Sequence, residues 1–245
     1  MPKGLKIRKL KLVPEKEALG RIPEGKVLIN TVNAHSFVTA QTDEAFAEAL
    51  QSGDYLIPDG ISIVKACRWL KCPEAPREKI AGADLFAFEM ERLNRKGGTC
   101  FFMGSSEKVL AKIREKAQEV YPNIRVETYS PPYKPEFTEE DNAAIIAAIN
   151  AADPDLLWIG MTAPKQEKWA RAHWDSLNIH CHCGTIGAVF DFFAGTVERA
   201  PKWWLEHNLE WLYRLLKEPK RMWKRNFVST PKFLALILKE KFARR

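Results

Sequence analysis

Short apolar segments alternate with segments of helical periodicity over residues 1–200. An apolar run of four to eight residues bounded by turn residues is typical of a buried strand. Five such strands are expected, in the segments KVLINTVNA (26–34), GTCFFMG (98–104), IRVETYS (124–130), DLLWIGM (155–161) and NIHCHCG (178–184).

Helical periodicity follows most of these strands. Helices are expected over 36–54, closed by Gly53, over 105–122, capped by Ser105 or Ser106, and over 163–177. Thr138 with Asp141 opens a further helix in the manner of a capping box. Strands that alternate with helices predict an α/β fold with a mostly parallel sheet. Ligands bind such sheets beyond the carboxyl ends of the strands, so the residues that follow each strand are the candidate site.

Residues 201–245 have helical character only and form a second predicted unit, an appendage to the 1–200 body. Pro219 and Pro231 are expected to break its helices. From Arg199 onward there are 13 Lys or Arg against 4 Asp or Glu, whereas residues 1–198 hold 25 against 27, so the net charge of +7 comes from the tail. Four of the eight tryptophans lie there too. Such a tail suits anionic lipid, nucleic acid or a phosphorylated substrate.

The remaining bulk properties describe an ordinary globular chain. It has 245 residues, 46% hydrophobic and 28% charged, which is enough for a substantial core. The five cysteines are expected to be reduced thiols. The first 20 residues carry charges throughout and are not expected to be a signal peptide. The aliphatic run FLALIL is far shorter than the roughly 20 residues of a spanning helix, so no membrane span is expected.

Two motifs suggest metal binding, and neither is expected to bind a metal. On a strand, His180 and His182 share one face and Cys181 and Cys183 the other, so the four side chains cannot surround one ion. The Asp-Pro-Asp motif at 153–155 lies before a strand, at the end of the sheet away from ligands, and is interpreted as a helix stop. No metal or cofactor is therefore predicted.

Polar residues after the first strand and in the Pro-Asp-Gly turn are candidate site residues. Thr31 and Asn33 follow the first strand, although Ser36 beside them could equally serve only to cap a helix. Asp59 lies in the turn, which the three residues could also form for purely local reasons.

The last two strands are followed by further candidates. Gly160, Lys165 and Gln166 offer a place for an anion or a nucleobase, or an ordinary helix start. Gly184 and Gly187 predict a tight turn whose N–H groups face a phosphate or sugar, or a plain connection. There is no GxGxxG and no Walker A loop, which weighs against classical dinucleotide or P-loop chemistry.

The order of these motifs along residues 26–228 resembles the WecG/TagA/CpsF family of bacterial glycosyltransferases. The segments that carry the resemblance are TVNAHS, PDGISIV, AGADLF, FFMGSSEKV, IGMTAPKQEKW, GAVFDFFAGTVERAPKW and LEWLYRLLKEPKR. The last two are the most distinctive.

The resemblance implies an α/β, Rossmann-like body, flanked by helices, with a C-terminal helical appendage that associates with the membrane. It also implies an inverting, metal-independent transferase without a cofactor. It would move an N-acetylmannosamine-type sugar, a related uronic acid or a hexose from a UDP donor to a polyprenyl-diphosphate-linked acceptor. The expected place is the inner face of the cell membrane, where a cytoplasmic enzyme attaches through its basic tail to anionic lipid during polysaccharide or teichoic acid synthesis. A homo-oligomer stays open.

The resemblance also implies roles for individual residues. Asp59 would be the general base, Thr31 would hold substrate beside it, and Arg221 would stabilise the leaving diphosphate. The positions expected to contact substrate are Asn33, Gly60, Gly104, Gly160, Lys165, Gln166, Gly184, Gly187, Asp191 and Arg214. The alternative for the arginines is a solvated basic face that contacts lipid.

Two other function classes remain as alternatives. A pI of 9.1 and the basic, aromatic tail would suit a nucleic-acid-binding module, but no RNA-binding signature is present and the charge is confined to the tail. A nucleotide-dependent oxidoreductase is disfavoured because the glycine fingerprint is absent.

Overall fold

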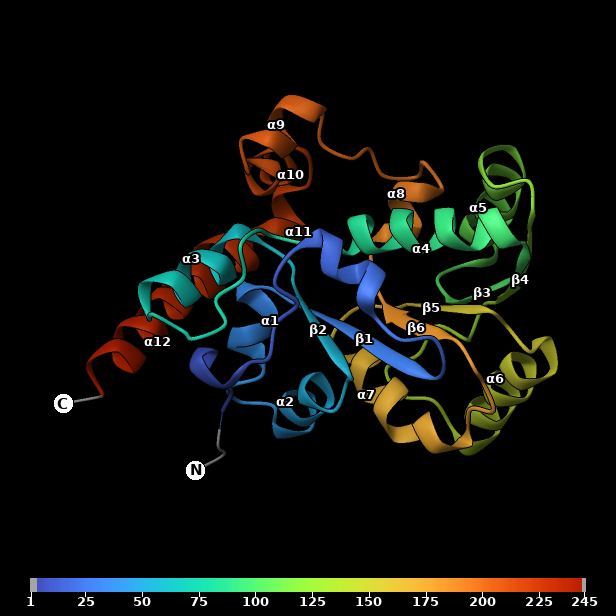
Figure 1. The fold of residues 1–245 in the computed structure, drawn as a ribbon, viewed down its shortest axis with the longest axis horizontal. Helices are drawn as coiled ribbons and strands as arrows, with labels where there is room; N and C mark the ends of the chain where they lie inside the picture. Colours follow the sequence, from blue (N-terminus) through green and yellow to red (C-terminus); the bar gives the residue numbers. More distant parts are fainter. Residues whose placement is uncertain (1–3, 244–245) are drawn as a thin grey trace.

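The centre of the molecule is a six-stranded sheet in which every strand is parallel to its neighbours. The computed structural model describes residues 4–243, except for the side chain of Arg221. Figure 1 shows the sheet between two layers of helices, which confirms the predicted α/β class. The strand order is β2-β1-β6-β5-β3-β4. The strands are β1 Val27–Val32, β2 Tyr55–Pro58, β3 Gly98–Gly104, β4 Ile124–Tyr129, β5 Leu156–Gly160 and β6 His182–Thr185.

Strand β2 was not among the predicted strands. It has only four residues, ends at a proline and lies at the edge of the sheet, where it pairs with β1 alone among the named strands. A short run that contains proline is tolerated at an edge because no central ladder needs its N–H. The predicted strand at 178–184 is also shifted, because β6 begins only at His182.

Helices α4, α5 and α8 cover one face of the sheet, and α2, α6 and α7 cover the other (Figure 1). The twelve α-helices of the described chain are α1 Ala34–Thr39, α2 Glu44–Gln51, α3 Ile61–Trp69, α4 Gly82–Lys96, α5 Glu107–Val120, α6 Glu139–Ala152, α7 Lys165–His173, α8 Val189–Phe193, α9 Lys202–Glu206, α10 Glu210–Lys217, α11 Pro219–Trp223 and α12 Thr230–Phe242. Short 3₁₀ helices occupy Ile7–Lys9, Lys16–Arg21 and Trp174–Ser176, and a π-helical segment occupies Lys224–Ser229.

The predicted helix caps are largely correct. Ser106 accepts a hydrogen bond from the N–H of Val109 and caps α5, and Thr138 with Asp141 forms the predicted capping box of α6. The single helix predicted over 36–54 is wrong. It is two helices, because Asp43 accepts from the N–H of Phe46 and begins α2 as a new helix.

The C-terminal helices lie near the edge of the sheet that β2 forms (Figure 1). Helix α12 packs on the body, since Phe233 and Ile237 are buried in a core cluster with residues of α1, α2 and α3. The rings of Phe37 and Phe233 meet edge to face at 5.6 Å. No helix within residues 4–243 is long and apolar enough to span a bilayer.

Pro219 lies at a break, because α10 ends at Lys217 and Pro219 starts α11. The break predicted at Pro231 is wrong. The π-helical segment leads directly into α12, and Pro231 occupies the first turn of that helix. The π-helical turn just before Pro231 changes the hydrogen-bond pattern there, and the helix continues through the proline.

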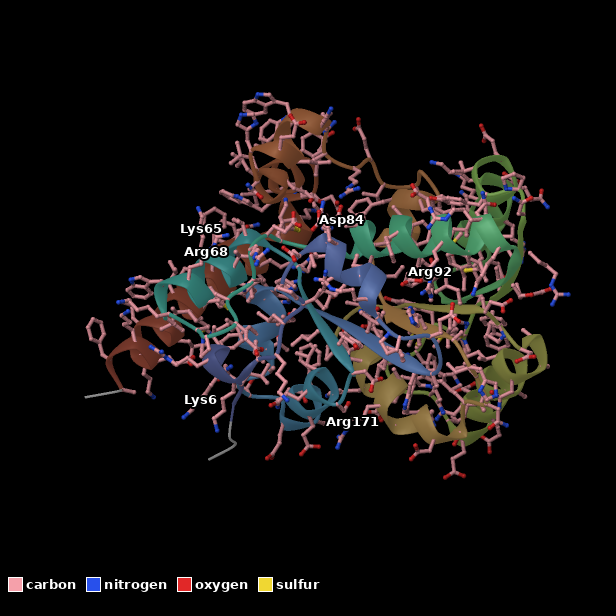
Figure 2. The ribbon with its side chains drawn as sticks, in the orientation of Figure 1. Lys6, Lys65, Arg68, Asp84, Arg92 and Arg171 are labelled. Atoms are coloured by element: carbon pink, nitrogen blue, oxygen red, sulfur yellow. The ribbon has the colours of Figure 1, made fainter. Side chains whose placement is uncertain are left out.

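The His-Cys run is structural in the described chain. Cys183 packs in the core between the sheet and the helices α6 and α7, while His182 faces α4 and lies 3.0 Å from Glu89 Oε1. This confirms that neighbouring side chains alternate between faces. Arg92 pairs with the other oxygen of Glu89 at 2.9 Å, and Figure 2 shows Arg92 between α4 and the sheet.

Candidate functional site

A cavity of about 1030 Å³ lies at the carboxyl ends of the strands. Residues within or just after each of the six strands line it: Thr31, Asp59, Ser105, Ser130, Gly160 and Gly187. Residues of the C-terminal region form the remaining wall: Arg199, Glu210, Arg214, Lys224 and Arg225. The cavity is therefore where the strand-end argument expected a ligand, and the tail helps to enclose it.

Asp59 lies directly after β2, and Thr31 lies beside it in β1. The backbone N–H of Asp59 donates to the carbonyl of Val32 at 2.9 Å. Gly60 follows Asp59 with φ 128°, a conformation that favours glycine. Removal from water raises the pKa of the Asp59 carboxyl, and the charge of Glu210 raises it further. A carboxyl with increased proton affinity in a cavity is suited to accept a proton.

Asn33 connects Asp59 to helix α1. Its Nδ2 donates to Asp59 Oδ2 at 3.4 Å, and its Oδ1 accepts from the N–H groups of His35 and Ser36 at 3.0 Å. Asn33, rather than Ser36, is therefore the N-cap of α1, and the Ser36 hydroxyl oxygen accepts a hydrogen bond from the N–H of Asn33. One residue thus caps a helix and fixes the candidate base.

Gln166 and Glu167 form a buried polar pair in the first turn of α7. Gln166 is 3% exposed; its Oε1 accepts from the N–H of Met161 and its Nε2 donates to Glu167 Oε1 at 2.8 Å. Glu167 Oε2 is buried with no hydrogen-bond partner among the described residues. Burial raises the pKa of Glu167 to about 7. Sequence reasoning missed Glu167, because a glutamate in a first turn is ordinary.

Lys165 links α7 to the Pro-rich loop after β4. Its Nζ donates to the carbonyl of Lys134 at 2.6 Å and lies 3.4 Å from the centre of the Phe137 ring. Burial lowers the pKa of Lys165. The predicted anion contact at Lys165 is therefore also a structural tie to the loop that lines the cavity. This loop, like Ser105 and Ser106 after β3, was not among the predicted site residues.

The predicted glycines separate into two groups. Gly160 and Gly187 line the cavity. Gly187 adopts φ 51°, and a Cβ added there would lie 3.6 Å from Gln166 Oε1. Gly60, Gly104 and Gly184 are not among the lining residues.

Two of the glycines outside the cavity allow close packing. A Cβ on Gly104 would lie 2.4 Å from the carbonyl oxygen of Gly160. A Cβ on Gly184 would lie 2.3 Å from the Trp158 ring. Gly184 also lies inside β6, so it does not form the predicted turn with Gly187.

Asp191 lines the cavity from α8, and its predicted contact with the nucleotide stays a prediction. Its side chain accepts from Thr196 Oγ1 at 3.4 Å, and its carbonyl accepts from the same hydroxyl at 3.2 Å. The segment that follows α8 is thereby tied to the cavity wall.

Arg214 is the cation in the tail with the clearest unused hydrogen-bonding capacity. Its Nε and Nη2 atoms are buried without a hydrogen-bond partner among the described residues, and Glu218 Oε1 is 3.9 Å from Nε, beyond hydrogen-bond reach. The guanidinium also stacks 5.2 Å from the Phe192 ring centre. An anion in the cavity would satisfy these donors.

The other predicted arginine, Arg221, has a side chain outside the described part of the chain, so its role stays a prediction. Sequence reasoning missed Arg199, Lys224 and Arg225, which line the cavity. Basic residues are common in the tail, and the π-helical segment changes the register by which a sequence pattern would select those that face inward.

The Asp-Pro-Asp motif is a structural feature, as interpreted from the sequence. Asp153 ends α6 in a left-handed conformation, and Asp155 accepts from the N–H of Thr99 at 2.8 Å. Among residues 4–243, no three His, Cys, Asp or Glu side chains gather in a way that could hold a metal ion.

Comparison with known proteins agrees with the resemblance noted in the sequence. The model of the glycosyl transferase WecG/TagA/CpsF family matches residues 4–245. The chain is also 33% identical over 213 residues to a protein of Bacillus subtilis (strain 168), named N-acetylglucosaminyldiphosphoundecaprenol N-acetyl-beta-D-mannosaminyltransferase. That match covers 87% of this chain and 79% of the relative. The chain therefore belongs to the WecG/TagA/CpsF family of glycosyltransferases.

Proposed function

We propose that the protein is an inverting glycosyltransferase that moves an N-acetylmannosamine-type sugar from a UDP donor to a polyprenyl-diphosphate-linked acceptor. A uronic acid or a hexose remains an alternative donor sugar. Family membership supports the reaction class, and the name of the Bacillus subtilis relative supports both the sugar and the lipid-linked acceptor. The observation that carries the proposal is that Asp59 and a set of cationic side chains line one cavity.

In the proposed reaction, Asp59 removes the proton from an acceptor hydroxyl. The hydroxyl oxygen then attacks the anomeric carbon, the bond from that carbon to the diphosphate oxygen breaks, and UDP leaves with the electron pair. A single displacement of this kind inverts the configuration at the anomeric carbon. The raised pKa of Asp59 favours proton acceptance, and the hydrogen bond from Asn33 orients the carboxylate. Thr31 is proposed to hold the sugar or the acceptor beside it.

The leaving diphosphate requires positive charge, and we assign this role to arginines of the tail. Arg214 has two buried nitrogen atoms without a hydrogen-bond partner among the described residues, and Arg199 and Arg225 line the same cavity. Planar guanidinium groups match pairs of phosphate oxygens. Arg221 is proposed as a further member from its sequence position. These fixed cations replace the divalent metal that many such transferases require, so the reaction is proposed to be metal-independent.

The other cavity residues are proposed to bind the donor. The amide of Gln166 is held at both ends, which leaves one Nε2 hydrogen free to orient a substrate oxygen. Gly160 and Gly187 allow close approach of the ligand to the backbone, and Asp191 and Lys165 are proposed to contact the nucleotide or sugar.

The tail is proposed to attach the enzyme to the inner face of the membrane. Large apolar side chains are exposed on the C-terminal helices: Trp203, Trp211, Leu216, Trp223, Phe227, Leu234, Leu238 and Phe242. Aromatic rings at headgroup level together with Lys and Arg near anionic lipid give attachment without spanning. This would bring the cavity to an acceptor that is itself anchored in lipid.

A donor screen tests the proposal. The enzyme is mixed with a lipid-linked N-acetylglucosamine diphosphate acceptor, individual UDP-sugars, and either a chelator or magnesium. We expect transfer from UDP-N-acetylmannosamine at the same rate under both conditions, with an inverted anomeric product. Retention of configuration, or a rate that collapses with chelator, would exclude the proposed mechanism.

A further inference from the structure

Helix α1 and the tail are joined by a partly buried hydrogen bond. His35 Nδ1 lies 2.8 Å from Ser229 Oγ, and Ser229 is only 5% exposed. Apolar packing reinforces the same pair of segments, because Phe37 of α1 and Phe233 of α12 meet edge to face. His35 is partly exposed at the cavity, but breaking the contact would leave the buried Ser229 hydroxyl without its partner, which is costly.

His35 is linked to Asp59, the candidate base, by hydrogen bonds through Asn33. The backbone N–H of His35 donates to Asn33 Oδ1 at 3.0 Å, and Asn33 Nδ2 donates to Asp59 Oδ2 at 3.4 Å. A movement of His35 therefore acts on the same amide that orients the Asp59 carboxylate.

Ser229 also ends the π-helical segment that begins at Lys224. Lys224 and Arg225, at the start of that segment, line the cavity. A π-helix shifts side chains relative to an α-helix, and such segments are frequent at functional sites. Holding Ser229 in place therefore holds the register in which Lys224 and Arg225 reach the cavity.

We propose that His35 and Ser229 are positioning residues that couple the seating of the C-terminal helices to the orientation of Asp59. This inference rests on the proposed function, in which Asp59 is the base. It means that the base is correctly aligned only when the tail, with its cationic side chains, is in place against α1. Acceptor deprotonation and leaving-group stabilisation are thus assembled together.

A double-mutant cycle tests the coupling. His35→Ala, Ser229→Ala and the double variant are compared for sugar transfer to a detergent-soluble acceptor. Small misplacements of a reacting group cost roughly 10- to 100-fold in rate, so we expect each single variant to lose that much kcat. His35 lines the cavity, so the KM for the donor separates the two roles: a positioning role predicts a KM within about twofold of wild type, and a large rise in KM with unchanged kcat in His35→Ala would overturn it. The double variant should be no slower than the slower single variant, since both remove one interaction.

Matched variants separate positioning from general damage. His35→Asn keeps a polar atom near the position of Nδ1 and should recover most of the rate. His180→Ala and Ser52→Ala alter exposed residues away from the cavity and should behave as wild type. Losses that multiply in the double variant would overturn the proposal, and so would a Ser229→Ala variant with wild-type kcat.

Amide hydrogen exchange gives a second measurement that needs no turnover. In Ser229→Ala, the amides of residues 33–40 should exchange faster than in wild type, while those of β3 and β5 are unchanged. Unchanged exchange over 33–40 would overturn the coupling even if the enzyme transfers sugar normally. A wild type that transfers no sugar in the donor screen would instead contradict the proposed function, and the exchange result would still decide the coupling.

Discussion

At the scale of single residues, Arg214 lines the cavity with Nε and Nη2 atoms that have no hydrogen-bond partner among the described residues, although Glu218 lies at ion-pair distance from Nε. We expect Arg214→Ala to lower kcat with a soluble acceptor by roughly 10²- to 10³-fold, the cost of losing one preorganised donor to a developing negative charge. Steady-state turnover and sedimentation with anionic vesicles should be measured together. We expect Arg221→Ala to behave similarly. If either variant changes vesicle binding alone, the arginine serves lipid attachment and not the leaving group.

Glu167 makes stability depend on pH. Its pKa rises from 4.5 to about 7 on folding, so between these values the folded state holds more protons than the unfolded state. Stability therefore falls as pH rises through this window, by roughly 3 kcal/mol in total. Glu167→Gln removes the titration while keeping an acceptor for Gln166.

Urea unfolding at pH 5 and pH 8 checks this prediction. Glu167→Gln should be more stable than wild type at pH 8, and the advantage should shrink toward zero at pH 5. Glu119→Gln, a change at an exposed glutamate, should show no such pattern. A Gln variant that loses stability at pH 8 would mean that the native carboxylate has a partner in its charged form.

At the scale of elements, Gly184 is expected to matter for packing rather than for ligand binding. Because a Cβ there would lie 2.3 Å from the Trp158 ring, Gly184→Ala should cost about 1–3 kcal/mol of unfolding free energy. The affinity for UDP, measured by calorimetry on the folded variant, should stay at the wild-type value. A selective loss of UDP affinity with normal stability would restore the role in nucleotide binding expected from the sequence.

Periodicity identified most of the strands and the helices that follow them, but the expected elements did not include α3 or α4, the longest helix of the described chain. It also failed where a local feature decides. Strand β2 was not predicted because a four-residue edge strand that ends at Pro58 is too short to show a clear hydrophobic pattern. The break between α1 and α2 was not predicted because the helical spacing of apolar residues continues across it, although Asp43 is a recognisable N-cap.

The strand-end argument found Thr31, Asn33, Gly160 and Gly187 because their positions follow from predicted strands. Asp59 follows β2, which was not predicted, and it was selected from its Pro-Asp-Gly turn and the family resemblance. Arg199 and Arg225 could not be found in that way. They reach the cavity from a separate segment whose packing against the body depends on tertiary contacts and on a π-helical register.

At the scale of the whole molecule, the C-terminal helices pack some apolar side chains against the body and expose others. They bury Phe233 and Ile237 against the body while exposing Trp223 and Phe227, whose rings lie 4.4 Å apart. Deletion from residue 201 should release the protein from anionic vesicles and abolish transfer, but it also removes core contacts. A substitution of exposed residues that leaves these core contacts in place is therefore a better test of membrane binding.

Trp223→Ser with Phe227→Ser should weaken binding to anionic vesicles at least about tenfold, because each ring would otherwise contribute more than about 1 kcal/mol of apolar burial. Vesicle sedimentation at two salt concentrations measures this. Val120→Ser, at an exposed apolar position on α5, is the matched control and should bind like wild type. Unchanged partitioning of the double variant would place the membrane-binding surface elsewhere.

The central claim is that Asp59, in a cavity closed by cations of the tail, takes the proton from the acceptor. The most direct measurement is kcat for Asp59→Asn with UDP-sugar and a soluble lipid-linked acceptor, alongside donor affinity. The account predicts a loss of roughly 10²- to 10⁴-fold, as expected for removal of a general base, with the affinity for UDP retained. An Asp59→Asn enzyme that turns over at the wild-type rate would contradict the account.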